Sequence, residues 1–500
     1  MNHAIRYVFA VSALFFGAAA SAETLTILAT NDTHSQIDPG ADGMGGVARR
    51  KVLIDSIRAE KENVILVDAG DVVQGSLFFT IYKGELEEKL MNALGYDIRI
   101  LGNHEFDNGL ERLAENLDDA DAELLCLNYD FTGTPLESVF KPYAVREIGG
   151  KRIGFLPVNL NPKGMISKHN AKGVRYVPAE EAARHGAWWL KNIENVDYVV
   201  AVTHIGYQPE TPPGDVDLVS RIADIDLVLG GHSHTLVGAD TPASRVKNSL
   251  GRDIVVEQAG YGGKYLAEIT VDLDSLGNAP EYKLIPVDAR LDSRTDPAIE
   301  EIIKPYRDID LLYSDYVGRT AQAMPRKSNE LLNFAADFVK RRGEELASGI
   351  DLSIINKGGL RTDLPKGRIS KGNIIDVMPF FNRVVVTDIK GSDLIPAFNQ
   401  MAAVDGNGVS ENVDITYDAD TDSCTEIIIS GKPIDPCRVY RLATIDYLEE
   451  GGDYMPTLSN GNIVSTSPSL LFEDVISYLS SPAMKGKKIK SSSRARMHTK

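Results

Sequence analysis

Four apolar stretches that end in polar side chains decide the fold: ILATNDTH (27–34), IRILGNHE (98–105), VVAVTH (199–204) and LVLGGHSH (227–234). Each starts with the aliphatic residues of a buried strand and ends in a polar segment that contains histidine, aspartate or asparagine. A fifth stretch, ILVDAGD (65–71), follows the same rule. In an open α/β sheet, ligands bind at the carboxyl ends of the strands. We therefore expect these polar residues to share one site.

Helix-length segments separate the apolar runs in the first half of the sequence. They are Arg49–Lys61, Glu85–Leu94, Leu110–Asn116 and Pro178–Ile193. This alternation of strands and helices predicts an α/β architecture. Residues 252–287 are rich in β-branched residues and are expected to add strands to the same domain.

The first 22 residues have the composition of an export signal. The apolar run Val8–Ala20 follows a short polar start, and small residues lead up to Ala22. About 20 apolar residues are needed to span a membrane, and the run is shorter than that. We expect cleavage near Ala22 and a periplasmic or secreted enzyme without stable membrane insertion.

Five hundred residues exceed what one hydrophobic core holds, so several parts are expected. These are the signal (1–22), an α/β domain (23–290), an acidic linker helix interrupted at Pro305 (291–317), a second α/β domain (318–482) and a basic tail (483–500). The second domain should contain a helix over 330–346 and strands at 352–355, 384–389 and 426–430. The tail lacks apolar periodicity and is predicted to be disordered.

The net charge of −18 excludes some classes of partner. An acidic chain is repelled by nucleic acids and anionic membranes, so we expect a small-molecule partner and no nucleic acid. A phosphorylated ligand would need local positive charge from metal ions or a few placed Arg and Lys residues. The oligomeric state stays open.

Three cysteines remain in a chain that we expect to be exported. Cys424 and Cys437 flank a predicted strand–turn–strand, which would allow a disulfide across the hairpin. Cys126 lies in an apolar run and is expected to be a buried thiol.

Seven side chains at the strand ends have the chemistry of metal ligands. They are Asp32, His34, Asp71, Asn103, His204, His232 and His234. Imidazole and carboxylate groups suit Zn²⁺ or Mn²⁺. A catalytic zinc takes three protein ligands, so seven candidates predict two divalent metal ions that share a carboxylate.

In sequence order, these residues match a known family. Asp32-x-His34, Gly70-Asp71, Gly102-Asn103-His104-Glu105, His204 and Gly231-His232-Ser233-His234 resemble the calcineurin-like metallophosphoesterases. ILATNDTHSQI and YDIRILGNHEFDNG are similar to the two signatures of 5′-nucleotidases, a branch that includes UDP-sugar hydrolases. The resemblance implies an N-terminal metallophosphoesterase sandwich of α-β-β-α layers, joined by a linker helix to a smaller α/β C-terminal domain that binds substrate.

The resemblance also implies roles for the residues of the first domain. One metal would be held by Asp32, His34, Asp71 and His234, and the second by Asp71, Asn103, His204 and His232. His104 and Asp107 would form the catalytic pair. They are three positions apart, so one helical turn would bring the Asp107 carboxylate within reach of the His104 ring.

Segments of the second domain resemble the substrate-binding segments of the family. Asn356-Lys357-Gly358-Gly359-Leu360-Arg361, Met378-Pro379-Phe380-Phe381 and Asp446-Tyr447-Leu448-Glu449-Glu450-Gly451-Gly452-Asp453 carry the likeness. They imply that Asn356, Gly358 and Arg361 meet substrate near the phosphate. By the same match, Phe380 and Tyr447 enclose the base and Asp453 binds the ribose; the alternative is that the two aromatic residues belong to the core. The stretch from Arg326 to Asn333 departs from the family pattern, so either Arg326 or Lys327 could meet phosphate.

The resulting prediction is an exported, dinuclear 5′-nucleotidase that also accepts nucleotide diphosphate sugars. The alternatives are a related phosphoesterase acting on 2′,3′-cyclic nucleotides or dinucleotides, a thiosulfate-ester hydrolase, and a non-catalytic binding protein. All candidate ligands and the catalytic pair are present, which disfavours the last alternative.

Overall fold

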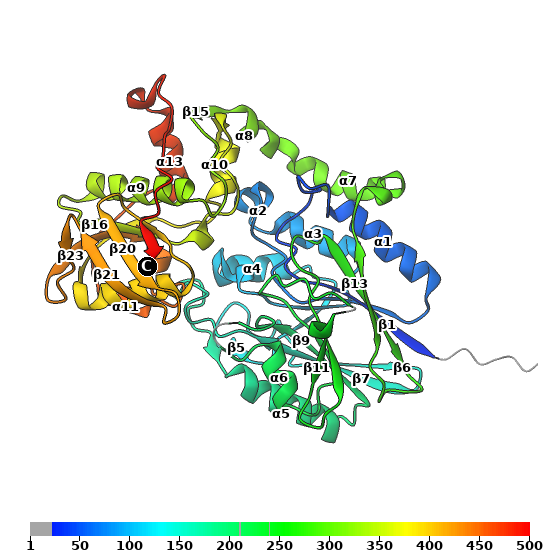
Figure 1. Ribbon diagram of the computed structural model, residues 1–500. Helices are drawn as coiled ribbons and strands as arrows, with labels where there is room; N and C mark the ends of the chain where they lie inside the picture. The colour runs from blue at the N-terminus through cyan, green and yellow to red at the C-terminus, as the bar shows by residue number, and fades with distance from the viewer. Residues whose placement is uncertain (1–22, 210–211, 240) are drawn as a thin grey trace, which may run out of the picture.

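The computed structural model describes residues 23–209, 212–239 and 241–500. The predicted export signal, with its cleavage site near Ala22, lies outside the described residues. The chain forms two lobes connected by a helical segment (Figure 1). None of the described helices combines the length and hydropathy needed to cross a membrane.

The N-terminal lobe is a sandwich of two six-stranded sheets. The first sheet has the order β14 (Glu281–Pro286), β13 (Tyr265–Asp272), β1 (Thr24–Thr30), β2 (Val64–Asp68), β3 (Ile98–Ile100) and β4 (Glu123–Leu125). The second has the order β11 (Arg245–Lys247), β12 (Asp253–Glu257), β10 (Leu227–Leu229), β9 (Tyr198–His204), β7 (Lys151–Asn159) and β6 (Ala144–Ile148). The strands that lead into the candidate site run parallel, so their carboxyl ends lie at one edge.

Helices cover the outer faces of both sheets, which confirms the expected α-β-β-α layers. The helices around the first sheet are α1 (Val47–Glu60), α2 (Leu77–Tyr82), α3 (Glu85–Leu94) and α4 (Gly109–Leu117). Those over the second sheet are α5 (Ala179–Asn192) and α6 (Asp215–Arg221). Alternate residues of β1 show why: Ile27 packs between the sheets, whereas Leu28 packs toward α1 and α3. A short ladder of β5 (Tyr129–Asp130) and β8 (Arg175–Tyr176) lies beside the sandwich.

The connection between the lobes is helical and broken, as expected from Pro305. It consists of α7 (Pro297–Ile303), a 3₁₀ segment over Lys304–Ile309 and α8 (Asp310–Ser314). Asp296 caps α7 by accepting the N–H of Ala298. Proline lacks the N–H that an α-helix needs and its ring clashes with the preceding turn, so the helix ends just before Pro305.

The C-terminal lobe is a smaller α/β domain. Its five-stranded sheet has the order β19 (Gly408–Val409), β16 (Leu352–Ile355), β23 (Val439–Ile445), β18 (Val384–Lys390) and β24 (Asn462–Thr466). A four-stranded sheet has the order β22 (Lys432–Pro433), β21 (Ser423–Ile429), β20 (Val413–Asp418) and β25 (Met497–Thr499), and β15 (Tyr316–Thr320) pairs with β17 (Gly367–Ser370). The helices are α9 (Asn329–Leu346), α10 (Lys371–Val377), α11 (Gly391–Ala403), α12 (Asp446–Glu449) and α13 (Leu471–Ser480).

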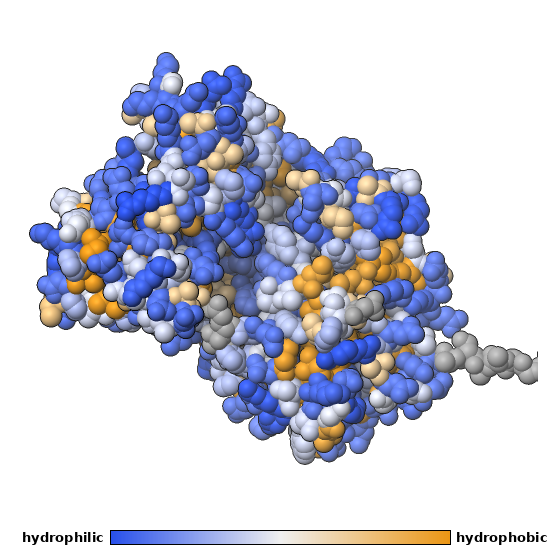
Figure 2. Space-filling model, in the orientation of Figure 1, coloured by the Kyte–Doolittle hydropathy of each residue, from blue (hydrophilic) through white to orange (hydrophobic). Residues whose placement is uncertain are grey.

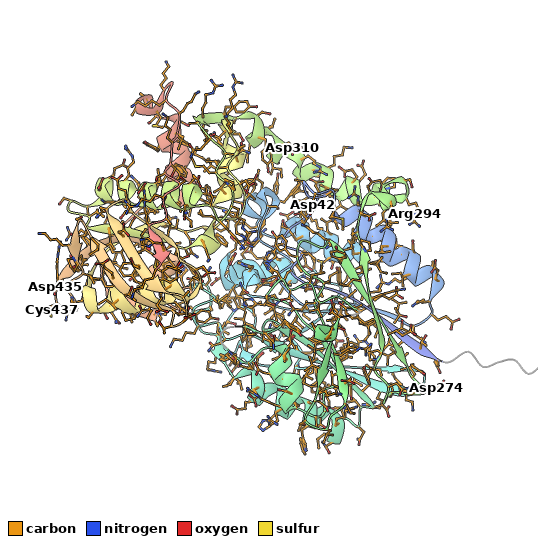
Figure 3. All side chains as sticks on the ribbon, viewed as in Figure 1. Asp42, Asp274, Arg294, Asp310, Asp435 and Cys437 are labelled. Atoms are coloured by element: carbon orange, nitrogen blue, oxygen red, sulfur yellow. The ribbon has the colours of Figure 1, made fainter. Side chains whose placement is uncertain are left out.

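Two expectations about the C-terminal half are wrong. The first concerns Cys424 and Cys437, which are free thiols, and no disulfide joins them. β22 ends at Pro433, and the chain then turns between Asp435 and Arg438, with Asp435 and Cys437 at the outer edge of the lobe (Figure 3). Pairing between β21 and β22 extends from Ile429 and Lys432 only to Ile427 and Ile434, so it stops short of Cys424 within β21 and of Cys437 after β22. Cys126 is buried and free, as expected.

The second concerns the basic tail, which is ordered, contrary to the prediction of disorder. Residues 497–499 pair with β20, and Arg496 is buried. The Arg496 guanidinium donates to both carboxylate oxygens of Asp337, each at 2.7 Å, and to the Val409 carbonyl at 2.8 Å. A buried, bidentate arginine pair supplies the binding energy that sequence periodicity does not reveal.

Arg496→Ala tests this docking of the tail. The change leaves the carbonyl of Val409 and the carboxylate of Asp337 without their donor, so we expect a loss of about 2 kcal/mol in unfolding free energy. Denaturant unfolding of the purified chain measures it. Lys488→Ala removes an exposed charge of the same tail and should change nothing; equal stability of both variants would show that the tail does not dock.

Candidate functional site

The structure brings the seven candidate ligands together at the carboxyl ends of the sandwich strands. β1 leads into Asp32 and His34, β2 into Asp71, β3 into Asn103 and β10 into His232 and His234, while β9 ends in His204. Five of them are buried, and His232 and His234 are partly exposed. Parallel pairing of these strands is the reason that residues far apart in sequence converge.

The ligands form two neighbouring groups, and Asp71 of the second group also faces the first. One group is Asp32, His34 and His234, with the Asp32 Oδ1 atom 3.5 Å from His234 Nε2 and 3.8 Å from His34 Nε2. The other is Asp71, His204 and His232. Asp71 Oδ2 lies 3.2 Å from His204 Nε2 and 3.7 Å from His34 Nε2, so this one carboxylate oxygen faces both groups. Asn103 Oδ1 lies 3.0 Å from His232 Nδ1.

The donor set fits positive ions. His204 Nδ1 donates to the Ala69 carbonyl at 2.7 Å, which turns the fully buried Nε2 toward Asp71 without a hydrogen bond. His34 Nδ1 lies 3.2 Å from the Gln74 carbonyl, and its Nε2 faces His234 Nε2 at 3.0 Å. Imidazole lone pairs directed at one another or at a carboxylate repel unless a proton or a metal ion lies between them.

The pKa values point the same way. Burial lowers the pKa of His34 well below its usual value, and it lowers those of His232 and His234 to about 3. Neutral imidazole is the form that binds a metal. Burial also opposes charge on His204, but the carboxylate of Asp71 outweighs it and raises the pKa of His204 to about 10. The centre of the cluster therefore stabilises positive charge.

The backbone is strained at this site. Five of the seven candidate ligands have a positive φ, namely Asp32, His34, Asp71, His232 and His234. Such a conformation costs on the order of 1–3 kcal/mol per non-glycine residue and persists only where the surroundings enforce it. Its concentration here marks a functional site, because packing alone does not require it.

His104 and Asp107 lie beside the cluster. His104 Nδ1 is 2.9 Å from Asp107 Oδ2, which leaves Nε2 free to face a substrate. The His104 ring lies 5.3 Å from that of His34 and 5.9 Å from that of Phe380, measured between centroids. His104 is also close enough to His34 and Asp71 to form a third candidate ligand group with them. Burial opposes a charged His104, but the carboxylates of Asp107 and Asp71 raise its pKa overall.

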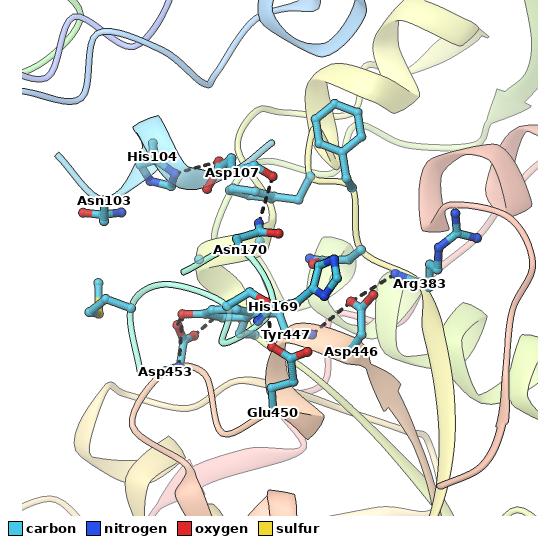
Figure 4. Close-up of a pocket in the computed structure, with 18 of the residues that line it drawn as sticks. Asn103, His104, Asp107, His169, Asn170, Arg383, Asp446, Tyr447, Glu450 and Asp453 are labelled. Carbon is cyan, nitrogen blue, oxygen red and sulfur yellow. Dashed lines mark hydrogen bonds and ion pairs between the residues drawn. The ribbon is translucent and has the colours of Figure 1, made fainter. Parts of the chain in front are cut away.

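A cavity of about 420 Å³ joins this pair to the C-terminal lobe (Figure 4). It lies where the space-filling view shows a hollow between the lobes (Figure 2). The N-terminal lobe contributes Asn103, His104 and Asp107 to its lining. The C-terminal lobe contributes all six predicted substrate residues: Asn356, Gly358, Arg361, Phe380, Tyr447 and Asp453. The structure thus places the aromatic pair in a cavity wall and not in the core.

Comparisons with known proteins agree with this geometry. The calcineurin-like phosphoesterase profile matches residues 25–236, and that of the 5′-nucleotidase C-terminal domain matches residues 312–460. This chain belongs to the 5′-nucleotidase family of calcineurin-like phosphoesterases. It is accordingly a phosphoric-ester hydrolase.

Relatives cover nearly the whole chain. The 5′-nucleotidase of Bos taurus is 28% identical, over 96% of this chain and 93% of that protein. The trifunctional nucleotide phosphoesterase YfkN of Bacillus subtilis is 28% identical over 86% of this chain, which spans only 32% of that longer protein. The crystal structure of a 5′-nucleotidase precursor from Thermus thermophilus superposes with a TM-score of 0.83 at 27% identity, covering 95% of this chain and 99% of that one.

The sequence patterns did not identify several residues that support this phosphoesterase site. The buried Glu105 carboxylate accepts the N–H groups of Asp71, Val72 and Gly102 at 3.1, 2.8 and 2.6 Å, which fixes the loop that carries Asp71. Asn31 Nδ2 donates to Asp32 Oδ2 at 2.6 Å. Glu105 lies inside the GNHEFD motif, so the sequence marked it as part of the site. Nothing in the sequence indicated that its carboxylate accepts backbone hydrogen bonds.

The structure also distinguishes Arg326 from Lys327 as candidates for contact with phosphate. Lys327 is exposed, whereas Arg326 is half-buried and its Nε atom has no hydrogen-bond partner. Burial, together with the nearby Arg361 guanidinium, lowers the pKa of Arg326, and Tyr261 lies close by. The Tyr261 ring packs on His34 and His234 at 5.1 and 4.8 Å between centroids. Arg326 therefore borders the cluster of candidate ligands through Tyr261.

Gly102→Ala tests whether the position of Asp71 controls metal binding. A Cβ atom at Gly102 would lie 2.1 Å from Asp71 Oδ1, so the carboxylate must move. We expect divalent-ion affinity to fall at least tenfold, measured by calorimetric titration of the metal-free protein. Gly277→Ala, where a Cβ meets nothing within 4 Å, is the control. Unchanged affinity in both variants would remove Asp71 from the metal site.

Proposed function

We propose that this protein is an exported, dinuclear metal-dependent phosphohydrolase that cleaves 5′-nucleotides to nucleoside and phosphate, and also acts on nucleotide diphosphate sugars. The observation that carries the proposal is the single cavity in which His104 and Asp107 meet the six substrate residues beside the metal-ligand cluster. The apolar run Val8–Ala20 supports export, and nucleotide catabolism outside the cytoplasm is the corresponding process.

The candidate ligand groups support a site for two metal ions. Asp32, His34 and His234 would hold one Zn²⁺ or Mn²⁺ ion, and Asn103, His204 and His232 the other, with Asp71 shared. When bound, the divalent ions supply Lewis acidity to the phosphoryl oxygens and activate water as a nucleophile. Shared use of Asp71 is supported by its Oδ2 atom, which faces both groups.

The protein's own side chains handle the remaining charge and protons. Asp107 accepts the Nδ1–H of His104, so the imidazolium directs its Nε2–H into the cavity. There it stabilises negative charge on the transferring phosphoryl group and the leaving oxygen. Arg361 and Arg326 each have a buried Nε–H without a partner, which suits them to bind phosphate oxygens.

The nucleoside end is defined by aromatic and polar residues. Phe380 and Tyr447 offer flat faces for a base, and stacking tolerates any base. The Asp453 carboxylate would accept ribose hydroxyl groups, with its Oδ2 held by Asn356 Nδ2 at 2.8 Å. Gly358 lacks a side chain and keeps the cavity open between Asn356 and Arg361.

The test is phosphate release by chain 23–500, stripped of metal and reloaded with Mn²⁺ or Zn²⁺. The substrates are AMP, UMP, UDP-glucose, a 2′,3′-cyclic nucleotide and 4-nitrophenyl phosphate. We expect metal-dependent release from AMP with kcat/KM at least tenfold above that for 4-nitrophenyl phosphate, because stacking adds about 1–3 kcal/mol of binding. Equal rates would contradict the base-binding assignment, and preference for the cyclic nucleotide would favour the related phosphoesterase class.

His104→Ala separates chemistry from metal binding. The imidazole belongs to neither of the two proposed metal sites, so the variant should bind both ions with wild-type affinity. Its kcat should fall about 10²–10³-fold, the typical cost of removing one donor that stabilises transition-state charge. Metal titration and steady-state kinetics on the same preparation check both results. If the variant loses metal but the reloaded enzyme keeps nearly the same turnover, His104 is a metal ligand and not the catalytic residue.

A further inference from the structure

An irregular segment of the N-terminal lobe, residues 162–170, reaches across to the C-terminal lobe. It lies between β7 and β8 and lines the cavity with Met165, Ser167, His169 and Asn170. Figure 4 shows Asn170 next to Asp107, to which a dashed line joins it. We call this segment the clasp loop.

Glu450, which directly follows α12, is the first anchor of the clasp loop. Its Oε2 atom accepts the Ser167 hydroxyl at 2.6 Å and the Lys168 backbone N–H at 3.0 Å. Hydrogen bonds to a charged acceptor are roughly twice as strong as those between neutral groups. A single carboxylate oxygen thus holds two consecutive residues of the other lobe.

Gly164 provides the second anchor. Its carbonyl accepts the Tyr447 hydroxyl at 3.0 Å and the Asp453 backbone N–H at 2.9 Å. Gly164 has a φ of 86°, and a Cβ there would lie 3.2 Å from the ring of Tyr454. Glycine therefore permits the close approach of the two backbones.

The clasp loop also reaches back toward the catalytic pair. Asn170 Nδ2 donates to the backbone carbonyl of Asp107 at 3.0 Å. The Tyr447 hydroxyl lies 2.8 Å from Asp453 Oδ1, so the anchor at Gly164 and the carboxylate assigned to ribose share one network. The loop connects the nucleoside end of the cavity with the backbone of Asp107.

We infer that the clasp loop assembles the nucleoside subsite, and that Ser167 and Glu450 are positioning residues that set the preference for nucleotides over simpler phosphate esters. The inference rests on the proposed function. Asp453 and Tyr447 take their orientation from Gly164, and the Glu450 bonds keep Gly164 in place. A phosphate ester without a nucleoside has no ribose hydroxyl groups for Asp453 to accept, so its turnover depends chiefly on the metal-ligand cluster, His104 and the arginines and less on the clasp loop.

The experiment is a double-mutant cycle with Ser167→Ala, Glu450→Ala and the combined variant. Each is assayed for kcat and KM with AMP and with 4-nitrophenyl phosphate. We expect the ratio of kcat/KM for AMP to that for 4-nitrophenyl phosphate to fall about threefold in Ser167→Ala and about tenfold in Glu450→Ala, chiefly through KM for AMP. The combined variant should match Glu450→Ala, because both changes remove the same contact. Lys172→Ala, an exposed residue just outside the loop, should keep the wild-type ratio.

Two results would overturn the inference. One is an unchanged ratio of kcat/KM for AMP to that for 4-nitrophenyl phosphate in both single variants. Equal losses for both substrates also leave this ratio unchanged, and they would show that the loop only supports the catalytic pair. The other is additive loss in the combined variant, which would show that the two residues act separately. If the wild-type protein itself shows no preference for AMP, the proposed function fails, whereas a wild-type preference retained in the variants refutes the clasp loop alone.

Discussion

The burial of negative charge at the strand ends is the constraint on which this structure depends. Asp32 and Asp71 are almost fully enclosed, and Glu105 lies behind them. Each buried carboxylate loses several kcal/mol of hydration, and the two aspartates repel each other. His204, whose pKa is raised to about 10 beside Asp71, offsets part of this cost, whereas His34, His232 and His234 stay neutral. Divalent ions would offset the rest, so the arrangement makes sense as a site whose charge is completed by metal.

Backbone hydrogen bonds between neighbouring loops maintain the strained, positive-φ conformation at the ligands. Asp32 N–H donates to the Gly70 carbonyl at 2.9 Å, and His34 N–H donates to that of Asp71 at 3.0 Å. The loops after β1 and β2 thus continue the pairing of their strands. Glu105 adds three acceptor contacts to the loop of Asp71. These hydrogen bonds restrict the loops after β1 and β2, and this restriction stabilises the left-handed conformations at their ligands.

Sequence reasoning succeeded where local pattern determines structure. α3 spans Glu85–Leu94, as predicted, and the rule that parallel strands end at one edge located the ligand cluster. It failed for the tail, because Arg496 finds Asp337 across 159 positions and no periodicity signals that pair. The clasp loop was missed for a similar reason: its partners are single backbone groups and one carboxylate of another domain, which carry no motif.

The charges lining the cavity are unevenly distributed along its length. Arg361 lies near His34 and His234 of the candidate ligands, whereas Asp446, Glu450 and Asp453 lie at the end away from His104 (Figure 4). Arg383 is also at that end, but it donates to the backbone carbonyls of Ser467 and Pro468. With a net charge of −18, the protein does not draw anions in from a distance, so orientation depends on these local charges. A 5′-nucleotide carries its charge at one end only and fits this polarity. A substrate with a second phosphate on the far side of the nucleoside would bring that charge against three carboxylates, which would oppose its binding.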